Sequence, residues 1–126
     1  MQDRPYRIAV VEDSPQYLAA IKAALADLRK FVLVGTADNA ADGIRLVERA
    51  VPDLLLVDVF LKQGTGIEVL QHCRSQQRPT TVTVMTSAPS RELEHYCRSL
   101  GATGFHDKAE GFDWLAAMAV GPNKAF

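Results

Sequence analysis

The hexapeptide Asp53-Leu54-Leu55-Leu56-Val57-Asp58 decides the fold of this chain, because it sets four consecutive apolar residues between two acids. A short, unbroken apolar run is typical of a strand that is buried on both faces inside a parallel sheet. We therefore predict that Asp58 is the last residue of a central strand. In open α/β sheets ligands bind at the carboxyl edge, so an acid there is either a chemical group or a burial cost that must be offset.

Outward from this hexapeptide, apolar runs alternate with helical patterns along the whole chain. The expected strands are 6–12, 31–37, 53–58, 80–85 and 103–106, and the expected helices are 15–28, 40–50, 66–75, 90–100 and 112–120. Ser14-Pro15 is a helix-start signal, and Thr65 with Glu68 matches a capping box. Five such units predict an α/β fold with one parallel sheet, helices on both faces and right-handed crossovers.

Length and composition exclude several classes of protein. The chain has 126 residues, 48% of them apolar and 23% charged, which fits one globular domain with a single core. We expect this domain to span 1–126, with a core over about 6–120 and a tail over 121–126. The net charge of −1 gives no reason to expect nucleic acid or an anionic membrane as a partner. Because the chain shows neither a secretory signal nor an apolar run of about 20 residues, we expect a cytoplasmic protein.

Polar side chains follow four of the five expected strands. Glu12 and Asp13 follow the first strand, Asp58 ends the third, Thr86 follows the fourth and Lys108 follows the fifth. The carboxyl ends of parallel strands meet at one edge, so we expect these side chains to converge. Three carboxylates alone would repel one another, and a hard divalent cation removes that conflict. Mg²⁺ suits such a site because it accepts one or two carboxylates and bridges to a phosphate.

This set of groups suggests phosphoryl transfer. With a metal bound, Asp58 stays ionised and can attack phosphorus to form an acyl phosphate. Lys108 can neutralise the equatorial oxygens, and Thr86 can hydrogen-bond to one of them.

These five positions, in this order and context, resemble the receiver domain of two-component response regulators over essentially 6–120. The resemblance implies a flavodoxin-like, doubly wound (βα)5 three-layer sandwich with strand order 2-1-3-4-5. It implies a Mg²⁺ site made by Glu12, Asp13, Asp58 and the backbone carbonyl of Phe60. One acid of the pair often coordinates through water in this family, so direct ligation is better assigned to Asp13 than to Glu12.

The resemblance also implies a mechanism and partners. Asp58 would be the phosphoacceptor, the donor would be a sensor histidine kinase or a phosphotransfer protein, and Thr86 and Phe105 would form the switch. The chain would signal rather than act as an enzyme, catalysing only its own phosphorylation and dephosphorylation. A downstream protein would read the face made by the fourth helix, fifth strand and fifth helix, a face that could also form a homodimer. A stand-alone receiver and a piece of a longer regulator remain equally open.

Three positions depart from the family pattern. Lys62 stands where the family usually has proline, Thr65-Gly66 stands where Asp-Gly is common, and Lys108-Ala109 replaces Lys-Pro. Since a cis bond without proline costs about 2.5–4 kcal/mol, we predict a trans bond after Lys108, with the following loop shifted and more mobile.

Rival interpretations come from other classes. A small hydrolase of haloacid dehalogenase type would also use Mg²⁺, Asp and Lys, but it usually has a second acid where this chain has Phe60. A flavodoxin-like nucleotide binder would need a glycine- or hydroxyl-rich loop where Glu12-Asp13 stands. A receiver-like interaction domain that is never phosphorylated is the fourth candidate, and the intact site residues argue against it.

Other residues attract weaker interpretations. Cys73 and Cys97 are expected to be buried, reduced thiols, and His72 and His95 are expected to be exposed. Trp114 lies off the inward stripe of the last helix, so it either covers the helix edge or meets a partner.

Overall fold

Strands and helices alternate through the whole of the computed structural model, which describes residues 4–77 and 79–120. The elements are β1 (Tyr6–Val11), α1 (Pro15–Ala26), β2 (Phe31–Ala37), α2 (Ala40–Ala50), β3 (Leu54–Asp58), α3 (Gly66–Ser75), β4 (Thr81–Thr86), α4 (Arg91–Ser99), β5 (Gly104–Asp107), a 3-10 turn η1 (Lys108–Glu110) and α5 (Asp113–Val120). The five predicted βα units are confirmed. The expected tail over 121–126 lies outside the described residues.

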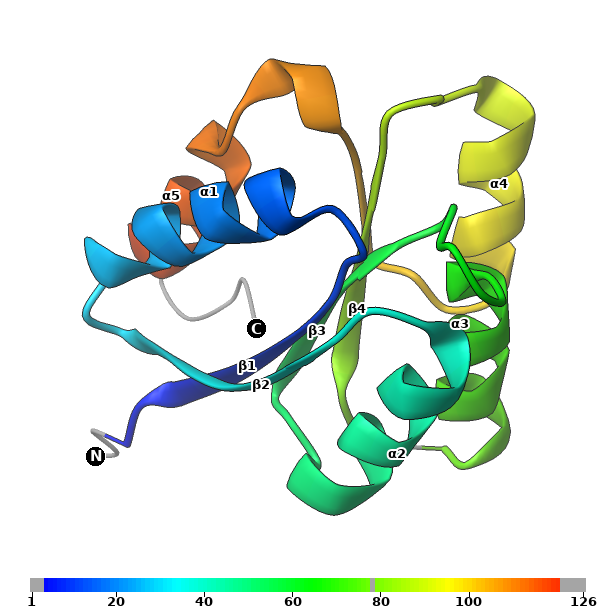
Figure 1. Ribbon diagram of the computed structural model, residues 1–126, viewed down its shortest axis with the longest axis horizontal. Helices are drawn as coiled ribbons and strands as arrows, with labels where there is room; N and C mark the ends of the chain where they lie inside the picture. The colour runs from blue at the N-terminus through cyan, green and yellow to red at the C-terminus, as the bar shows by residue number, and fades with distance from the viewer. Residues whose placement is uncertain (1–3, 78, 121–126) are drawn as a thin grey trace.

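All strand pairs of the sheet are parallel, and the strand order is β2-β1-β3-β4-β5, as the family resemblance implies. Helices α1 and α5 cover one face of the sheet, and α2, α3 and α4 cover the other, which gives three layers (Figure 1). β3 lies in the centre, where Val57 pairs with Val11 of β1 and Asp58 pairs with Met85 of β4. The carboxyl ends of β1, β3 and β4 therefore meet at one edge.

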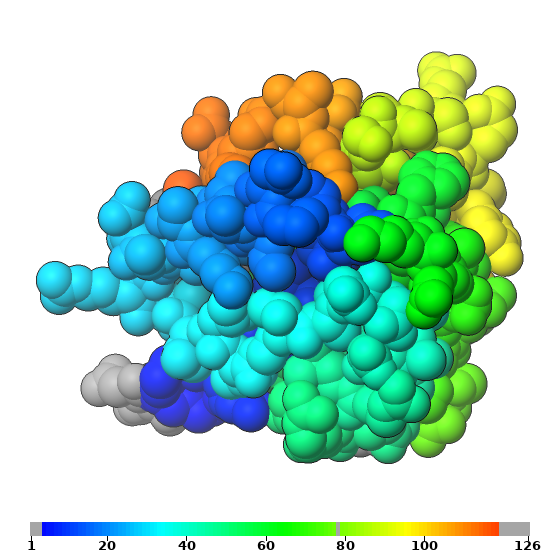
Figure 2. All heavy atoms as spheres, in the orientation of Figure 1, coloured from blue at the N-terminus to red at the C-terminus, as the bar shows by residue number. Residues whose placement is uncertain are grey.

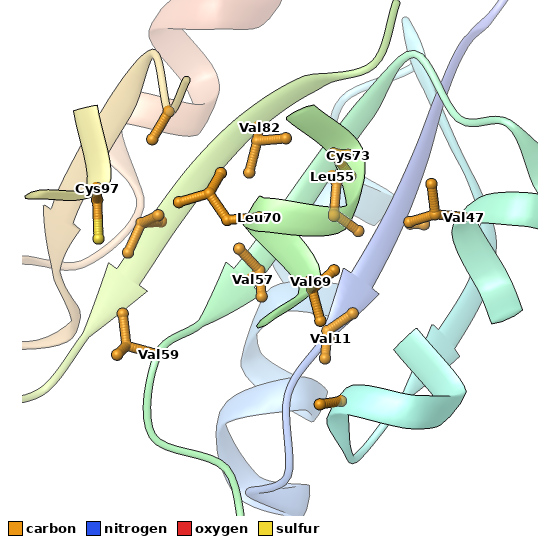
Figure 3. Packing of buried hydrophobic residues seen from close by; sticks show 14 of the residues in the cluster. Val11, Val47, Leu55, Val57, Val59, Val69, Leu70, Cys73, Val82 and Cys97 are labelled. Atoms are coloured by element: carbon orange, nitrogen blue, oxygen red, sulfur yellow. The ribbon is translucent and has the colours of Figure 1, made fainter. Parts of the chain in front are cut away.

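A cluster of buried apolar residues lies on each face of the sheet, and β3 contributes side chains to both. Its residues Leu55 and Val57 pack toward α2, α3 and α4, in the cluster that Figure 3 shows. Leu54 and Leu56 point the other way, into the cluster beneath α1 and α5. All five residues of β3 are buried. The sequence prediction of a strand buried on both faces is confirmed, and it explains why the run has no polar alternation.

The predicted helix starts are confirmed at the level of single hydrogen bonds. Ser14 Oγ accepts the N–H of Tyr17 at the start of α1, and the capping box of Thr65 and Glu68 is complete. Some bounds differ by a few residues. β1 ends at Val11, so Glu12 lies in the following loop, and α1 ends at Ala26 because the chain turns at Asp27 before Leu28.

The expectation about the two cysteines is confirmed. Cys73 and Cys97 are free, buried thiols. Within the described residues, no helix combines the length and the apolar character that crossing a membrane requires.

Candidate functional site

The ends of β1 and β3 bring three acids together. Glu12, Asp13 and Asp58 each offer a carboxylate oxygen, and these oxygens lie within 4.8 Å of one another. Glu12 is 1% exposed and Asp58 is 4% exposed, while Asp13 is half-buried. The predicted convergence of the two strand ends is therefore present, and it concentrates negative charge in a largely desolvated place.

Lys108 bridges two of these acids from the end of β5. Its Nζ lies 2.8 Å from Asp58 Oδ2 and donates a hydrogen bond of 3.0 Å to Glu12 Oε2. Backbone amides complete the arrangement: the Ser14 N–H donates to Glu12 Oε2 at 3.0 Å, and the Phe60 N–H donates to Asp58 Oδ1 at 3.2 Å. One ammonium thus holds two carboxylates together.

The site holds more carboxylates than cations, and the pKa values of Glu12 and Lys108 are both shifted. Burial raises the pKa of the Glu12 carboxyl, and the nearby charge of Asp58 adds to the effect. Burial also disfavours the ammonium of Lys108, but hydrogen bonds to Asp58 and Glu12 outweigh it, so the pKa of Lys108 is raised. The lysine is therefore a fixed cation at neutral pH.

A divalent metal ion fits this group of residues. Three carboxylates against one ammonium leave an excess of two negative charges when all are ionised, which a divalent cation would balance. Glu12 Oε1 is buried and accepts no hydrogen bond from the described residues, although Lys108 Nζ lies 3.0 Å away. Carboxylate oxygens are the hard donors that Mg²⁺ prefers. Among the described residues, this cluster is where three such acids meet.

The two predicted switch residues lie beside the site on β4 and β5. Thr86 ends β4 next to the level of Asp58, is fully buried, and accepts the N–H of Ala88 at 3.1 Å. Phe105 pairs with Val84 and packs, half-buried, against the core beneath α4. The hydroxyl and the aromatic ring are thus at the positions that a switch between the site and α4 would need.

The loop from β3 to α3 passes close to Asp58. A Cβ on Gly66 would lie 2.2 Å from the carbonyl oxygen of Asp58, so only glycine permits this contact. The Gly66 N–H donates to the Val59 carbonyl at 2.8 Å, and Phe60 forms a bridge with Thr65. Phe60, whose backbone carbonyl is the predicted fourth metal ligand, has a side chain that is 55% exposed beside the site.

The bond between Lys108 and Ala109 is trans, as predicted, since the described residues contain no cis peptide bond. The chain continues directly into the turn η1, where the Ala109 N–H donates to Asp107 Oδ1 at 2.9 Å. The expected mobility of this loop stays a prediction.

The sequence analysis missed three side-chain contacts. The Tyr17 ring lies beneath Lys108 Nζ, 4.5 Å from it at the centroid, and the burial of Tyr17, with the charges of Glu12 and Asp58, raises its pKa to about 12. Trp114 stacks on His106, so it is half-buried against β5. His72 was expected to be exposed and is instead half-buried, 2.6 Å from Glu48. Tyr17 lies in the first turn of α1, three residues after the N-cap Ser14, and its nearness to the acidic pair in sequence was a signal that could have revealed it.

The comparisons with known proteins agree on one family. The family model of the response regulator receiver domain matches residues 8–119. A protein of Pseudomonas aeruginosa named as a transcriptional regulator is 31% identical over 116 residues, covering 90% of this chain and 56% of the relative. The DNA-binding transcriptional activator EvgA of Escherichia coli is 25% identical, over 86% of this chain and 52% of the relative. The chain therefore spans about half the length of the curated relatives it matches.

Solved structures agree. The signal receiver domain of a Luxo repressor protein from Vibrio parahaemolyticus superimposes with a TM-score of 0.87 at 26% identity, covering 97% of this chain and 93% of that one. The response regulator domain of Thermotoga maritima CheB shares the fold, with a TM-score of 0.77, 23% identity and coverage of 86% and 81%.

A parallel five-stranded sheet with an acidic cluster and a lysine at its carboxyl edge defines a receiver-type signalling domain. The chain belongs to the response regulator receiver domain family of two-component systems. The haloacid dehalogenase interpretation is not favoured by any of these comparisons.

Proposed function

We propose that Asp58 is the phosphoacceptor of this receiver domain and that phosphorylation switches a protein-binding surface. One observation carries the proposal: Lys108 holds Asp58 and Glu12 in one hydrogen-bonded cluster, with Asp13 close enough to share a metal ion. The whole domain, 1–126, would act as one signalling unit rather than as an enzyme with a separate substrate.

The roles of the residues follow from their positions. A carboxylate oxygen of Asp58 forms a new bond to phosphorus while the bond between phosphorus and the donor's imidazole nitrogen breaks, and the imidazole leaves. Lys108 turns its ammonium toward the negative oxygens of the transferred group, where a preorganised cation stabilises the transition state. Asp13, Asp58, the Phe60 carbonyl and Glu12, the last through water, would hold Mg²⁺. When bound, this ion supplies charge neutralisation for the phosphoryl oxygens.

Thr86 and Phe105 would carry the change away from Asp58. The Thr86 oxygen accepts the Ala88 N–H, and the new phosphoryl group offers an acceptor for the proton of the same hydroxyl, which would draw Thr86 toward Asp58. A shift of Thr86 frees space toward β5, and the half-buried Phe105 ring can move into it. Such a step biases an equilibrium between two surface conformations rather than creating a new one.

The partners follow from the family. A sensor histidine kinase or a phosphotransfer protein would supply the phosphoryl group. The face made by α4, β5 and α5 would contact a downstream protein or a second copy of the chain. Because the curated relatives are about twice as long and several are named as transcription regulators, an attached DNA-binding segment in the native protein is part of this proposal.

Phosphate-affinity (Phos-tag) electrophoresis with acetyl phosphate tests the first step. Wild type should be labelled when Mg²⁺ is present and unlabelled when EDTA removes it, and Asp58→Asn should stay unlabelled in both conditions. Asp27→Asn is the matched control, since Asp27 lies at the end of α1 and is exposed. Labelling of Asp58→Asn equal to wild type would refute the assignment of the acceptor.

A further inference from the structure

Tyr17 touches both ends of the segment that links β5 to α5. Its half-buried ring lies 4.5 Å from Lys108 Nζ and 5.4 Å from the ring of Phe112, each measured to the ring centroid. In the space-filling view, the orange atoms of this segment lie against the blue atoms of α1 (Figure 2). One side chain of α1 therefore connects the site lysine with the beginning of α5.

The aromatic contacts continue from Phe112 to β5. Phe112 and Trp114 have centroids 6.4 Å apart, and Trp114 stacks on His106 at 4.1 Å with an angle of 8° between the rings. The separation of Phe112 and Trp114 lies within the range of about 4.5–7 Å that aromatic pairs prefer, and the Trp114–His106 stack is closer still. Trp114 Nε1 also donates to the Gly111 carbonyl at 3.0 Å, which fixes the indole to the segment itself.

Between its two ends, the segment has little to hold it. Ala109, Glu110 and Gly111 are exposed, and Gly111 has a φ of 77° with no atom within 4 Å of where its Cβ would stand. The Ala109 hydrogen bond to Asp107 is local. The placement of the segment on α1 thus depends on Lys108 and Phe112, the two residues that contact Tyr17.

We infer that Tyr17 is a positioning residue for Lys108 and that it transmits a change at Asp58 to Trp114 and His106. The inference rests on the proposed function and adds a second route beside Thr86 and Phe105. Phosphorylation converts the carboxylate partner of Lys108 into a dianionic group, so Nζ must rearrange its hydrogen bonds. The attraction between a cation and a ring depends on their distance, and Tyr17 passes any displacement on to Phe112 by direct contact.

Trp114 reports this route directly because it is the single tryptophan of the chain. The full chain is treated with Mg²⁺ and acetyl phosphate at pH about 8, where His106 is neutral. Labelling on Phos-tag gels and the emission of Trp114 are measured on the same samples. The variants are Tyr17→Leu, Tyr17→Phe and, as a matched control, Tyr96→Leu, whose ring is 45% exposed on α4.

The inference predicts a change in Trp114 emission when wild type is labelled. Tyr17→Phe and Tyr96→Leu should keep that change and the wild-type labelling rate. Tyr17→Leu should be labelled more slowly, because Lys108 is less well positioned, and at equal labelling should show an emission change about fivefold smaller. A wild-type labelling rate for folded Tyr17→Leu would remove the positioning role. A wild-type-sized emission change in labelled Tyr17→Leu overturns the inference, and so does labelling of wild type without any emission change. If wild type is not labelled at all, the proposed function fails first. If Tyr17→Leu does not fold, Phe112→Leu breaks the next contact and is judged by the same criteria.

Discussion

Glu12 and Lys108 show how a single cation sets the chemistry of the site. Buried carboxylates are costly unless each is paired, and here two of them share one ammonium at about hydrogen-bonding distance. The other oxygen, Glu12 Oε1, lies 3.0 Å from Lys108 Nζ but accepts no hydrogen bond from the described residues. Burial is the main reason that the pKa of Glu12 is raised, and the negative charge of Asp58 adds to it, while Ser14 and Lys108 oppose the shift.

His106 predicts a pH dependence of stability. Burial lowers the pKa of the folded imidazole, the charge of Arg98 adds to this, and Glu94 opposes it. In the unfolded chain the pKa is about 6.5. Between these two values the unfolded state binds more protons than the folded state, so the stabilising contribution is present above pH about 6.5 and is lost as the pH falls toward the folded pKa.

Urea unfolding over a pH series measures this contribution. His106→Phe keeps a ring against Trp114 but cannot be protonated, so its free energy of unfolding should fall less than that of wild type between neutral and mildly acidic pH. Parallel curves for the two proteins would contradict the assignment to His106. His95→Phe serves as the control, because His95 is exposed on α4.

At the scale of elements, the start of α3 is placed by a glycine rather than by a side chain. Gly66→Ala puts a methyl group 2.2 Å from the Asp58 carbonyl oxygen, so either α3 or the end of β3 must move. We expect a loss of about 1–3 kcal/mol in unfolding free energy, typical of overpacking, together with slower labelling by acetyl phosphate.

Gly101→Ala is the control that separates lost stability from slower labelling in Gly66→Ala. Unlike Gly66, Gly101 has a positive φ of 108°, but no atom lies within 4 Å of its Cβ position, and it follows α4 away from the site. Its variant should lose stability through backbone strain, about 1–2 kcal/mol, and keep the wild-type labelling rate. Gly66→Ala with wild-type stability and labelling would show that the loop adapts without cost.

At the scale of the whole molecule, the edge of the sheet opposite the site carries its own polar network. Arg7 Nη1 donates to the carbonyls of Ala50 and Val51 at 2.8 and 3.0 Å, so it caps the end of α2. Its backbone N–H donates to Asp53 Oδ2 at 2.8 Å, and Arg4 also pairs with Asp53. β1, α2 and the first acid of the organising hexapeptide are thus tied together.

Arg7→Met tests whether this edge serves stability alone. Loss of the two charged hydrogen bonds should cost about 1–3 kcal/mol in unfolding free energy, while the labelling of Asp58 stays unchanged because the sheet separates the two edges. Arg4→Met is the matched control and should have a far smaller effect, since the Arg4 side chain is 63% exposed. A slower labelling rate for folded Arg7→Met would argue against the separation of the two edges.

The sequence by itself determined the elements and the direction of the sheet. The unbroken apolar run from Leu54 to Val57 predicted a strand buried on both faces. Ser14 and Thr65 marked helix starts because their caps are local interactions within four residues. The convergence of Asp13, Asp58 and Lys108 on one edge also followed, since parallel strands share their carboxyl ends. The strand order and the switch residues came from the family resemblance.

Only the tertiary structure decided which side chains touch. The contact of Lys108 with the Tyr17 ring, the stack of His106 on Trp114 and the approach of Gly66 to the Asp58 carbonyl all join segments whose relative placement depends on packing across layers. A pattern in sequence reports burial and local hydrogen bonding, which depend on near neighbours. Distances between layers depend on every side chain in the two cores, so only the three-dimensional structure could give them.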